Sequence, residues 1–326
     1  MAEVAARARV SIATVSRALN TPGLVSEALA RRVHAAADSL GYRPNPIAGT
    51  LAGARAPIVG VVVPSVTNSF FSGTLQAMSS PLADAGYQIM LGHHEYDLAR
   101  EEALIGTFLT WRPAALVTTG LHHTRRGRTL LARAECPVVE MWALGRRPVD
   151  SAVGFSNRLA GALAARHLLE RRRHHLAYVG AIMERDPRAE ERMVGFREAV
   201  AAAAGSEPRV HRAADRVFTA GGDAVRALLE TGRPLDGIAF SSDVLALGAL
   251  FELERRGIAV PDDIALVGYG DLEFAACSNP SLTTVRPPRD RIGTEVAAHL
   301  VARLGGGDLG RAVVDLGCEL VPRGTT

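Results

Sequence analysis

The sequence contains no lysine, so all 37 of its Lys and Arg positions are arginine. This absence excludes the lysine of a nucleotide-binding P-loop and a lysine Schiff base. Cysteine is also scarce, and the three that are present, Cys136, Cys277 and Cys318, are widely spaced and odd in number. Such spacing favours a reducing compartment over a disulfide framework or a metal cluster.

Long apolar segments are missing as well. No run approaches the roughly 20 residues needed to cross a bilayer, and the N-terminus lacks the charged segment followed by an apolar one that marks a secretion signal. We therefore expect a cytoplasmic protein without membrane contacts. With 326 residues, 48% of them hydrophobic, the chain can bury the cores of more than one domain.

Signatures of catalysis are absent too. The sequence has no Gly-x-Ser-x-Gly elbow and no metal-ligand spacing. The glycine-rich run 305–310 fits a dinucleotide-binding fingerprint in its letters, but it follows a helical pattern rather than a strand, which indicates a loop. Three histidine pairs have no ligand-like partners: His93-His94, His122-His123 and His174-His175. We expect no enzymatic activity, no metal and no cofactor.

The positive charge lies at the N-terminus. Residues 1–56 contain seven arginines and three carboxylates, a net charge of +4, whereas the whole chain carries only +3. The other 270 residues are therefore slightly acidic. This asymmetry favours a nucleic-acid contact in the first 56 residues over a membrane or an acidic substrate.

The same 56 residues predict short helices separated by turns. Ser11 is placed to cap a helix over residues 12–20, in which Val15 and Leu19 face inward. A third helix follows over about 26–40. The prolines of the next segment, Tyr-Arg-Pro-Asn-Pro, exclude a helix interior and predict a linker.

From residue 58 onward, β-branched runs alternate with helical patterns. This alternation predicts parallel, doubly wound sheets. Two such series, one before and one after about Phe155, indicate two similar subdomains with a cleft between them. The predicted strands cover residues 58–63, 88–91, 115–119, 138–141, 176–179, 238–240 and 264–268.

Several motifs together carry a resemblance to a known family. The run from Val10 to Asn20, Val-Ser-Ile-Ala-Thr-Val-Ser-Arg-Ala-Leu-Asn, followed by Val-Ser at 25–26 and Gly-Tyr-Arg-Pro-Asn at 41–45, resembles the DNA-binding headpiece of the lactose-repressor/galactose-repressor family. The resemblance continues in segments 51–53, 68–71, 192–196, 242–243, 261–269 and 282–285. Within the family, segments 137–140, 153–155 and 315–317 are most similar to the gluconate-operon repressors.

The resemblance implies an N-terminal all-α helix-turn-helix headpiece and an α/β periplasmic-binding-protein-like core of two doubly wound parallel-sheet subdomains. It also implies a homodimer that binds a palindromic operator in double-stranded DNA. The implied domains are the headpiece over 1–43, a linker and hinge helix over 44–56, and an effector-binding and dimerisation core over 57–326. Within the core, the N-subdomain covers about 57–155 and 286–318, and the C-subdomain about 156–285 and 319–326.

In a helix-turn-helix the second helix lies in the major groove, with its first residues at the base edges. Arg17 can make a bidentate contact to guanine, whereas Ile12 and Ala13 offer only apolar contact, for instance to a thymine methyl. The hydroxyl and amide side chains nearby suit phosphate, which sets the register without reading sequence. These side chains are Ser11, Thr14, Ser16 and Asn20.

The resemblance adds three DNA contacts, Asn45, Ala48 and Leu51, in the hinge. Asn45 can cap a short helix that starts with Pro46. In the family the hinge helices of two subunits pair in the minor groove, where Leu51 acts as a wedge that bends the DNA. Gly49 lowers the intrinsic stability of this helix by about 1 kcal/mol relative to alanine. We therefore expect hinge folding to depend on DNA.

The effector cleft is expected between the subdomains, at the carboxyl ends of their strands. Arg192 matches the family's main ligand-clamping arginine, and Arg188 lies one helical turn before it. Two guanidinium groups suit a carboxylate, so a sugar acid such as gluconate is the expected effector. One ring of the pair Phe70-Phe71 is expected to stack on it. The other residues expected at the cleft are Glu140, Phe218, Ser242, Asp243 and Asp271.

Several positions depart from the family pattern. Gly270 stands where the family has an aspartate that grips ligand hydroxyls, with Asp271 one place later, and a cleft without that carboxylate repels an acid less. Ser156 replaces another aspartate. Asp243 is expected either to cap its helix or to contact the ligand. Arg9 replaces a glycine of the first turn, where a left-handed conformation is costly for arginine.

We interpret the chain as a sequence-specific DNA-binding transcription regulator, a repressor of sugar or sugar-acid catabolic genes that an effector releases from DNA. Two alternatives stay open. A solute-binding protein of a sugar transporter shares the core fold but predicts a signal peptide and no headpiece. A regulator that binds DNA without any small-molecule response is compatible with every motif above.

Overall fold

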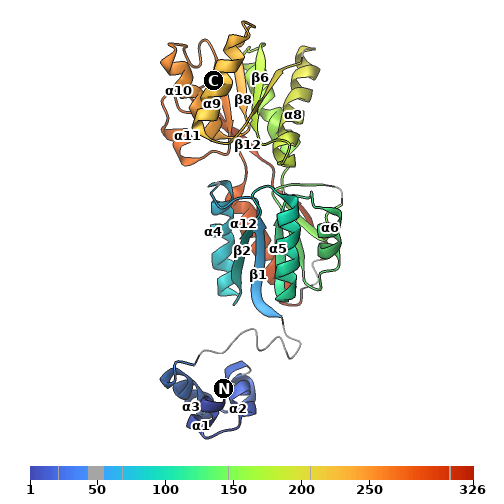
Figure 1. Cartoon of the computed structure of the whole chain (residues 1–326), viewed down its shortest axis with the longest axis vertical. Coiled ribbons are helices and arrows are strands. Elements are labelled where there is room, and N and C mark those ends of the chain that lie inside the picture. The colour runs from blue at the N-terminus through green and yellow to red at the C-terminus, as the bar shows by residue number, and fades with distance from the viewer. Residues whose placement is uncertain (21, 43–54, 68, 146, 206, 308–309) are drawn as a thin grey trace. The chain divides into compact units, whose positions relative to one another are not determined.

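The structure is a computed structural model (Figure 1). It describes residues 1–20, 22–42, 55–67, 69–145, 147–205, 207–307 and 310–326. The chain divides into two compact units, Met1–Pro57, which includes the headpiece, and Ile58–Thr326, which is the core. No helix within these described ranges is long and apolar enough to cross a membrane.

The headpiece consists of α1 (Ala2–Ala8), α2 (Ile12–Asn20), a 3-10 turn η1 (Pro22–Leu24) and α3 (Glu27–Ser39). The apolar faces of the helices meet in a small core, in which Val15 and Val33 are fully buried and Leu19 is partly buried. Ser11 Oγ accepts a hydrogen bond from the backbone N–H of Thr14 at 3.1 Å. The predicted helix cap and the predicted inward face of α2 are therefore confirmed.

The turn between α1 and α2 places Arg9 in the costly conformation. Arg9 has φ 50° and ψ 51°, and left-handed angles cost a residue with a Cβ roughly 1–2 kcal/mol. The Arg9 N–H bonds to the carbonyl of Ala6 at 3.2 Å, and the Val10 N–H bonds to that of Ala5 at 3.0 Å. This is the hydrogen-bond pattern of a helix that ends at a left-handed residue, so the strain falls on Arg9.

Replacing Arg9 with glycine is expected to stabilise the headpiece by about 0.5–1 kcal/mol. Glycine relieves the strain, although its greater freedom in the unfolded chain offsets part of the gain. Arg9→Ala is the matched control, because it removes the same charge and keeps a Cβ. Hydrogen exchange of the headpiece amides in the intact protein should be slower in Arg9→Gly than in Arg9→Ala. Equal exchange in the two variants would contradict the strain.

The core contains two six-stranded sheets, one in each of two lobes (Figure 1). In the N-terminal lobe the order is β11 (Val313–Asp315), β5 (Ser151–Gly154), β4 (Val138–Met141), β3 (Pro113–Thr119), β1 (Ala56–Val63) and β2 (Gln88–His93). In the C-terminal lobe it is β12 (Glu319–Val321), β10 (Thr283–Arg286), β9 (Ala265–Tyr269), β8 (Gly237–Phe240), β6 (Leu176–Ala181) and β7 (Arg209–Ala213).

The strand pairing confirms the predicted parallel architecture. The pairs β1–β2, β3–β4, β4–β5, β6–β7, β6–β8 and β8–β9 are parallel, whereas β10 and β12 run antiparallel. The sequence pattern does not predict β5, β7, β10, β11 and β12. β11 and β12 are three residues long, and β5 (Ser-Ala-Val-Gly) and β10 (Thr-Thr-Val-Arg) each contain a single branched aliphatic residue, so none of them forms an apolar run. β7 is a partly exposed edge strand that contains two arginines.

The helices pack in pairs beside these sheets, α4 with α12, α7 with α8 and α9 with α10. α7 and α8 approach closely because each carries a glycine where they cross. A Cβ on Gly161 would lie 1.8 Å from the carbonyl oxygen of Arg192, and one on Gly195 would lie 1.9 Å from that of Arg158. This crossing sets the position of Arg192. The bounds are α4 (Ser69–Asp84), α5 (Leu98–Thr110), α6 (Arg125–Ala132), α7 (Asn157–Glu170), α8 (Pro187–Ala204), α9 (Phe218–Glu230), α10 (Asp243–Arg255), α11 (Glu273–Cys277) and α12 (Arg289–Leu304).

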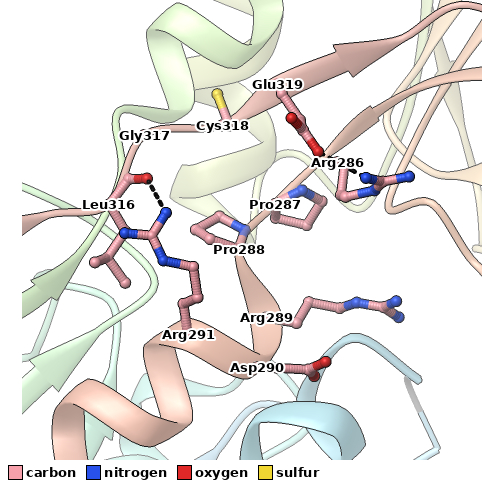
Figure 2. Close-up of a pocket in the computed structure, with 10 residues that line it drawn as sticks. All are labelled: Arg286, Pro287, Pro288, Arg289, Asp290, Arg291, Leu316, Gly317, Cys318 and Glu319. Carbon is pink, nitrogen blue, oxygen red and sulfur yellow. Dashed lines mark hydrogen bonds and ion pairs between the residues drawn. The ribbon is translucent and has the colours of Figure 1, made fainter.

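The chain crosses between the lobes after β5, β10 and β11. Two of these crossings, together with the start of α12, line a pocket of about 450 Å³ (Figure 2). Arg286 and Glu319 form an ion pair of 2.7 Å there, and Arg291 Nη1 donates to the carbonyl of Leu316 at 3.4 Å (Figure 2). These two contacts connect the segments where the chain crosses after β10 and after β11, which we call the hinge of the core.

Candidate functional site

The outer face of α2 presents the side chains expected at DNA. Ile12, Ala13 and Arg17 are exposed, and Ile12 keeps 50% of its surface in solvent although it is apolar. Ser11 is exposed and Thr14 and Ser16 are partly exposed. These residues therefore share one accessible surface at the start of the second helix. Four predicted positions lie outside what the structure describes: the Asn20 side chain and residues Asn45, Ala48 and Leu51.

A cavity of about 440 Å³ lies between the lobes at the carboxyl ends of their strands, where parallel sheets bind ligands. Of the residues expected at the effector, Phe70 and Ser242 line it. Phe218 follows the lining residue Val217, and its ring packs on that of Phe274 with the centroids 6.0 Å apart. The lining also includes Ser65, Thr67, Tyr96, Arg185 and Arg216.

Beside the cavity, three arginines of the C-terminal lobe surround one carboxylate. Arg188 Nε and Arg216 Nη2 lie 3.0 Å and 3.4 Å from Asp186 oxygens. Arg192 Nη1 donates to Asn157 Oδ1 at 2.7 Å, and Arg192 forms no ion pair within the described part of the chain. Burial raises the pKa of Asp186, but the three arginines outweigh it and lower that pKa to about 2. The cluster therefore has an excess of buried positive charge.

The same arginines keep hydrogen-bond donors available. Arg188 and Arg192 are only 8% and 5% exposed. Arg188 Nη1, Arg192 Nε and Arg216 Nε have no hydrogen-bond partner among the residues that the structure describes. The Arg192 guanidinium also stacks over the Tyr269 ring at 3.9 Å. Such a set of fixed donors suits an anion that accepts several hydrogen bonds.

Trp142 is a residue of this region that the sequence reasoning missed. It directly follows β4, and its ring centroid lies 6.4 Å from that of Phe70 and 5.2 Å from that of Phe71. Its buried Nε1 has no partner within the described ranges. The available signal was its place at the carboxyl end of the predicted strand 138–141, where ligands of parallel sheets bind.

Trp142 is also one of five non-glycine residues near the cleft with left-handed backbone angles. Its φ is 70°, and those of Glu95, Tyr96, Ile182 and Asp271 are 52°, 60°, 48° and 48°. Each follows a strand by one to three residues at its carboxyl end. Strain of this kind persists only where the surrounding structure imposes it, and it gathers at functional sites.

The missing carboxylate at position 270 has a steric cause. A Cβ on Gly270 would lie 2.1 Å from the Phe70 ring, and the φ of 131° at this position is one that side chains rarely adopt. Phe70 therefore occupies the space of a side chain at 270. The neighbouring Asp271 pairs with Arg286 at 2.5 Å and with Arg323 at 2.6 Å. Its charge is therefore neutralised by arginines at the hinge of the core.

Asp243 is likewise engaged by the protein. Its buried carboxylate accepts from Thr284 Oγ1 at 2.6 Å and from the Leu272 N–H at 2.8 Å, and burial raises its pKa to about 6. The cap of α10 is Ser242, whose Oγ accepts from the Leu245 N–H at 3.4 Å. The expectation that Asp243 caps this helix is therefore wrong.

Glu140 belongs to a buried triad that the sequence reasoning missed. His123 Nδ1 lies 2.9 Å from Glu101 Oε2, and His123 Nε2 lies 3.1 Å from Glu140 Oε1. Burial lowers the pKa of His123, but the hydrogen bonds to both glutamates outweigh it and raise that pKa to about 9. His123 is therefore charged at neutral pH. Its partners are 22 and 17 residues away in the sequence, which is why His122-His123 looks isolated there.

Known proteins share this organisation. Residues 1–45 match the family model described as bacterial regulatory proteins, lacI family, and residues 165–326 match the periplasmic binding protein-like domain. The chain is 39% identical over 326 residues to the HTH-type transcriptional regulator GntR of Pseudomonas aeruginosa, across 99% of this chain and 94% of that protein. It is 34% identical over 323 residues to GntR of Escherichia coli, across 99% and 97%.

A solved structure agrees over the same length. The crystal structure of a LacI-family transcriptional regulator from Silicibacter pomeroyi superposes with a TM-score of 0.93 at 33% identity, covering 99% of this chain and 98% of that one. These relatives are transcriptional regulators rather than enzymes. The chain belongs to the lacI family of bacterial regulatory proteins and is a DNA-binding transcriptional regulator.

Proposed function

We propose that this regulator is a cytoplasmic, homodimeric repressor whose core binds a sugar acid of the gluconate type and then releases its operator. In this proposal residues 1–43 form the DNA-binding headpiece, 44–56 the linker and hinge helix, and 57–326 the effector-binding and dimerisation core. A solute-binding protein of a transporter does not explain the headpiece.

The excess positive charge of the cleft is the observation that supports an acid as the effector. Arg188 and Arg216 pair with Asp186, whereas Arg192 has no ion pair, and each of the three keeps a buried nitrogen without a partner among the described residues. A carboxylate would accept hydrogen bonds from these donors and compensate the charge, whereas a neutral sugar would leave it buried. Gly270 supports the same class, because an aspartate there would repel an acid.

On the DNA side, Arg17 reads a guanine while Ile12 and Ala13 contact apolar base edges, and the neighbouring hydroxyl and amide side chains hold phosphates. The exposure of this face of α2 supports these roles. The family resemblance alone adds three contacts in the minor groove, from Asn45, Ala48 and Leu51. The phosphate-binding residues are Ser11, Thr14, Ser16 and Asn20.

Arg17→Ala is expected to weaken operator binding by about 1–3 kcal/mol per half-site and to relax specificity at a single base pair. The reason is that a bidentate arginine reads one guanine, whereas phosphate contacts act on all sequences alike. Selection of binding sites from a random library measures both effects. Arg32→Ala, an exposed arginine of α3, is the control and should keep the parent's sequence preference. An unchanged preference in Arg17→Ala would contradict the assignment.

A thermal-shift panel of sugars and sugar acids tests the effector class. A ligand that binds only the folded protein stabilises it by about 2.7 kcal/mol at 100 times its Kd. D-gluconate should therefore raise the unfolding temperature of the full chain, and D-glucose at equal concentration should not. A shift with D-glucose alone would contradict the acid. No shift with any compound would favour the regulator without a small-molecule response.

A further inference from the structure

A second, much smaller cavity lies between the lobes. It measures about 20 Å³, which leaves room for about one water molecule. His94 and Glu101 of the N-terminal lobe line it together with Arg188 of the C-terminal lobe. Tyr96 and Arg185 line both this cavity and the one of about 440 Å³. The small cavity therefore adjoins the larger one and contains an arginine of the cluster.

The three side chains leave buried polar atoms unpaired at this cavity. Glu101 is 1% exposed and His94 is 4% exposed. Glu101 Oε1, both ring nitrogens of His94 and Arg188 Nη1 have no hydrogen-bond partner among the described residues. The other Glu101 oxygen is held by His123 at 2.9 Å, so the carboxylate cannot turn freely. An unpaired buried group has lost its hydrogen bonds to water without replacement, and a ligand that pairs it removes this cost.

The unpaired atoms define the complementary chemistry. Arg188 Nη1 can only donate, and Glu101 Oε1, as part of a carboxylate, can only accept. Burial lowers the pKa of His94, an effect that Glu101 opposes and Arg188 reinforces, so His94 is neutral and offers one donor and one acceptor. A carboxylate complements Arg188, and a hydroxyl, which both donates and accepts, complements Glu101 and His94. The small cavity has room for only the hydroxyl oxygen, so the carboxylate must lie beside it, toward the larger cavity that Tyr96 and Arg185 also line. The two groups are therefore on neighbouring carbons.

The charge around the small cavity favours an acid. Arg188, Arg192, Arg216 and His123 lie in this region, and Arg185 also lines the cavity. The carboxylates that face them there are Asp186, Glu101 and Glu140. A ligand carboxylate at Arg188 is therefore compensated.

We propose that His94, Glu101 and Arg188 form a subsite for the 2-hydroxy carboxylate end of the effector. The subsite selects an acid with a hydroxyl on the carbon next to its carboxylate. Acids that lack this hydroxyl leave Glu101 and His94 unpaired. The inference rests on the proposed binding of a sugar acid and names the part of that acid which is recognised.

Calorimetric titration of the full chain with D-gluconate and 2-deoxy-D-gluconate tests the subsite. The parent should bind D-gluconate about 10- to 100-fold more tightly than 2-deoxy-D-gluconate. Glu101→Gln replaces the charged acceptor of the hydroxyl with a neutral one and should reduce this preference at least about fivefold. His94→Phe removes the other hydroxyl partner and should reduce the preference similarly. Glu102→Gln, the same change at the next residue, which contacts Thr124 rather than the cavity, should keep the preference.

The outcomes separate the subsite from the proposed function. If the parent binds both acids equally, or if both variants keep the parent's preference, the subsite is wrong while the sugar-acid function stands. If the parent binds neither acid, both are wrong. His94→Phe removes no side-chain hydrogen bond of the described structure, so it still tests the subsite where Glu101→Gln unfolds the lobe.

Discussion

Arg192→Ala will weaken D-gluconate binding by about 30-fold or more. Removing one partner of a buried, hydrogen-bonded charge pair costs about 2–5 kcal/mol, and each 1.4 kcal/mol is about tenfold in affinity. Arg192 fits this case because it is almost fully buried, is held by Asn157 and Tyr269, and has no ion pair within the described residues. Calorimetric titration of the intact protein measures the loss.

The matched control is Arg197→Ala on the same helix. Arg197 is exposed and pairs with Glu207 at 2.9 Å, so this variant should bind D-gluconate like the parent. In both the parent and this control, bound operator should lower the affinity for D-gluconate by about 5- to 150-fold, because coupling between two sites is reciprocal. If Arg192→Ala binds D-gluconate as tightly as the parent, Arg192 is not part of the effector site. If D-gluconate binds equally well with and without operator, the two sites are not coupled.

His123→Gln will lower the free energy of unfolding by about 3–5 kcal/mol. The imidazolium lies between Glu101 and Glu140 with its side chain fully buried, and removing one partner of a buried ion pair leaves uncompensated charge. Glutamine can still donate one hydrogen bond but carries no charge. Urea denaturation at pH 6.5 measures the difference. His122→Gln, an exposed neighbour, should change stability by no more than about 0.5 kcal/mol.

The triad also gives the stability a defined pH dependence. Because the folded pKa of His123 is raised to about 9 from 6.5, the folded protein holds its proton between these values while the unfolded chain releases it. The stabilisation is complete below pH 6.5 and is lost as pH rises through 9, with a slope of up to about 1.4 kcal/mol per pH unit. His123→Gln should be flatter than the parent over this range. If the free energy of unfolding falls equally steeply with pH in both proteins, His123 is not the group that holds the proton.

The headpiece could be predicted from the sequence because its signals are local. The hydroxyl of Ser11 caps the helix that begins beside it, and the spacing of Val15 and Leu19 turns both toward the core. Arg9 ends α1 in the left-handed conformation that its place in the turn requires. Each of these features depends on residues within one or two helical turns, so a short segment of sequence contains the whole cause.

The positions of the main strands along the chain could be predicted for a related reason. Central strands such as β1 and β3 are buried on both faces and therefore read as continuous apolar runs. The short strands β11 and β12 have mostly exposed or half-buried residues, so their sequence carries no such run. They are strands because the longer strands beside them offer free hydrogen-bond partners.

Motif resemblance singled out Arg188 and Arg192, which the structure places in one buried cluster with Asp186 and Arg216, but it did not show the contacts of the nearby carboxylates. Asp271 is neutralised by Arg286 and Arg323, which are 15 and 52 residues away in the sequence, and Glu101 is held by His123 from another segment. The sequence by itself determined the helix-turn-helix and the doubly wound core. Only the tertiary structure decided which charges are paired and which buried atoms are left for a ligand, because pairing depends on distances between segments that meet only when the chain folds.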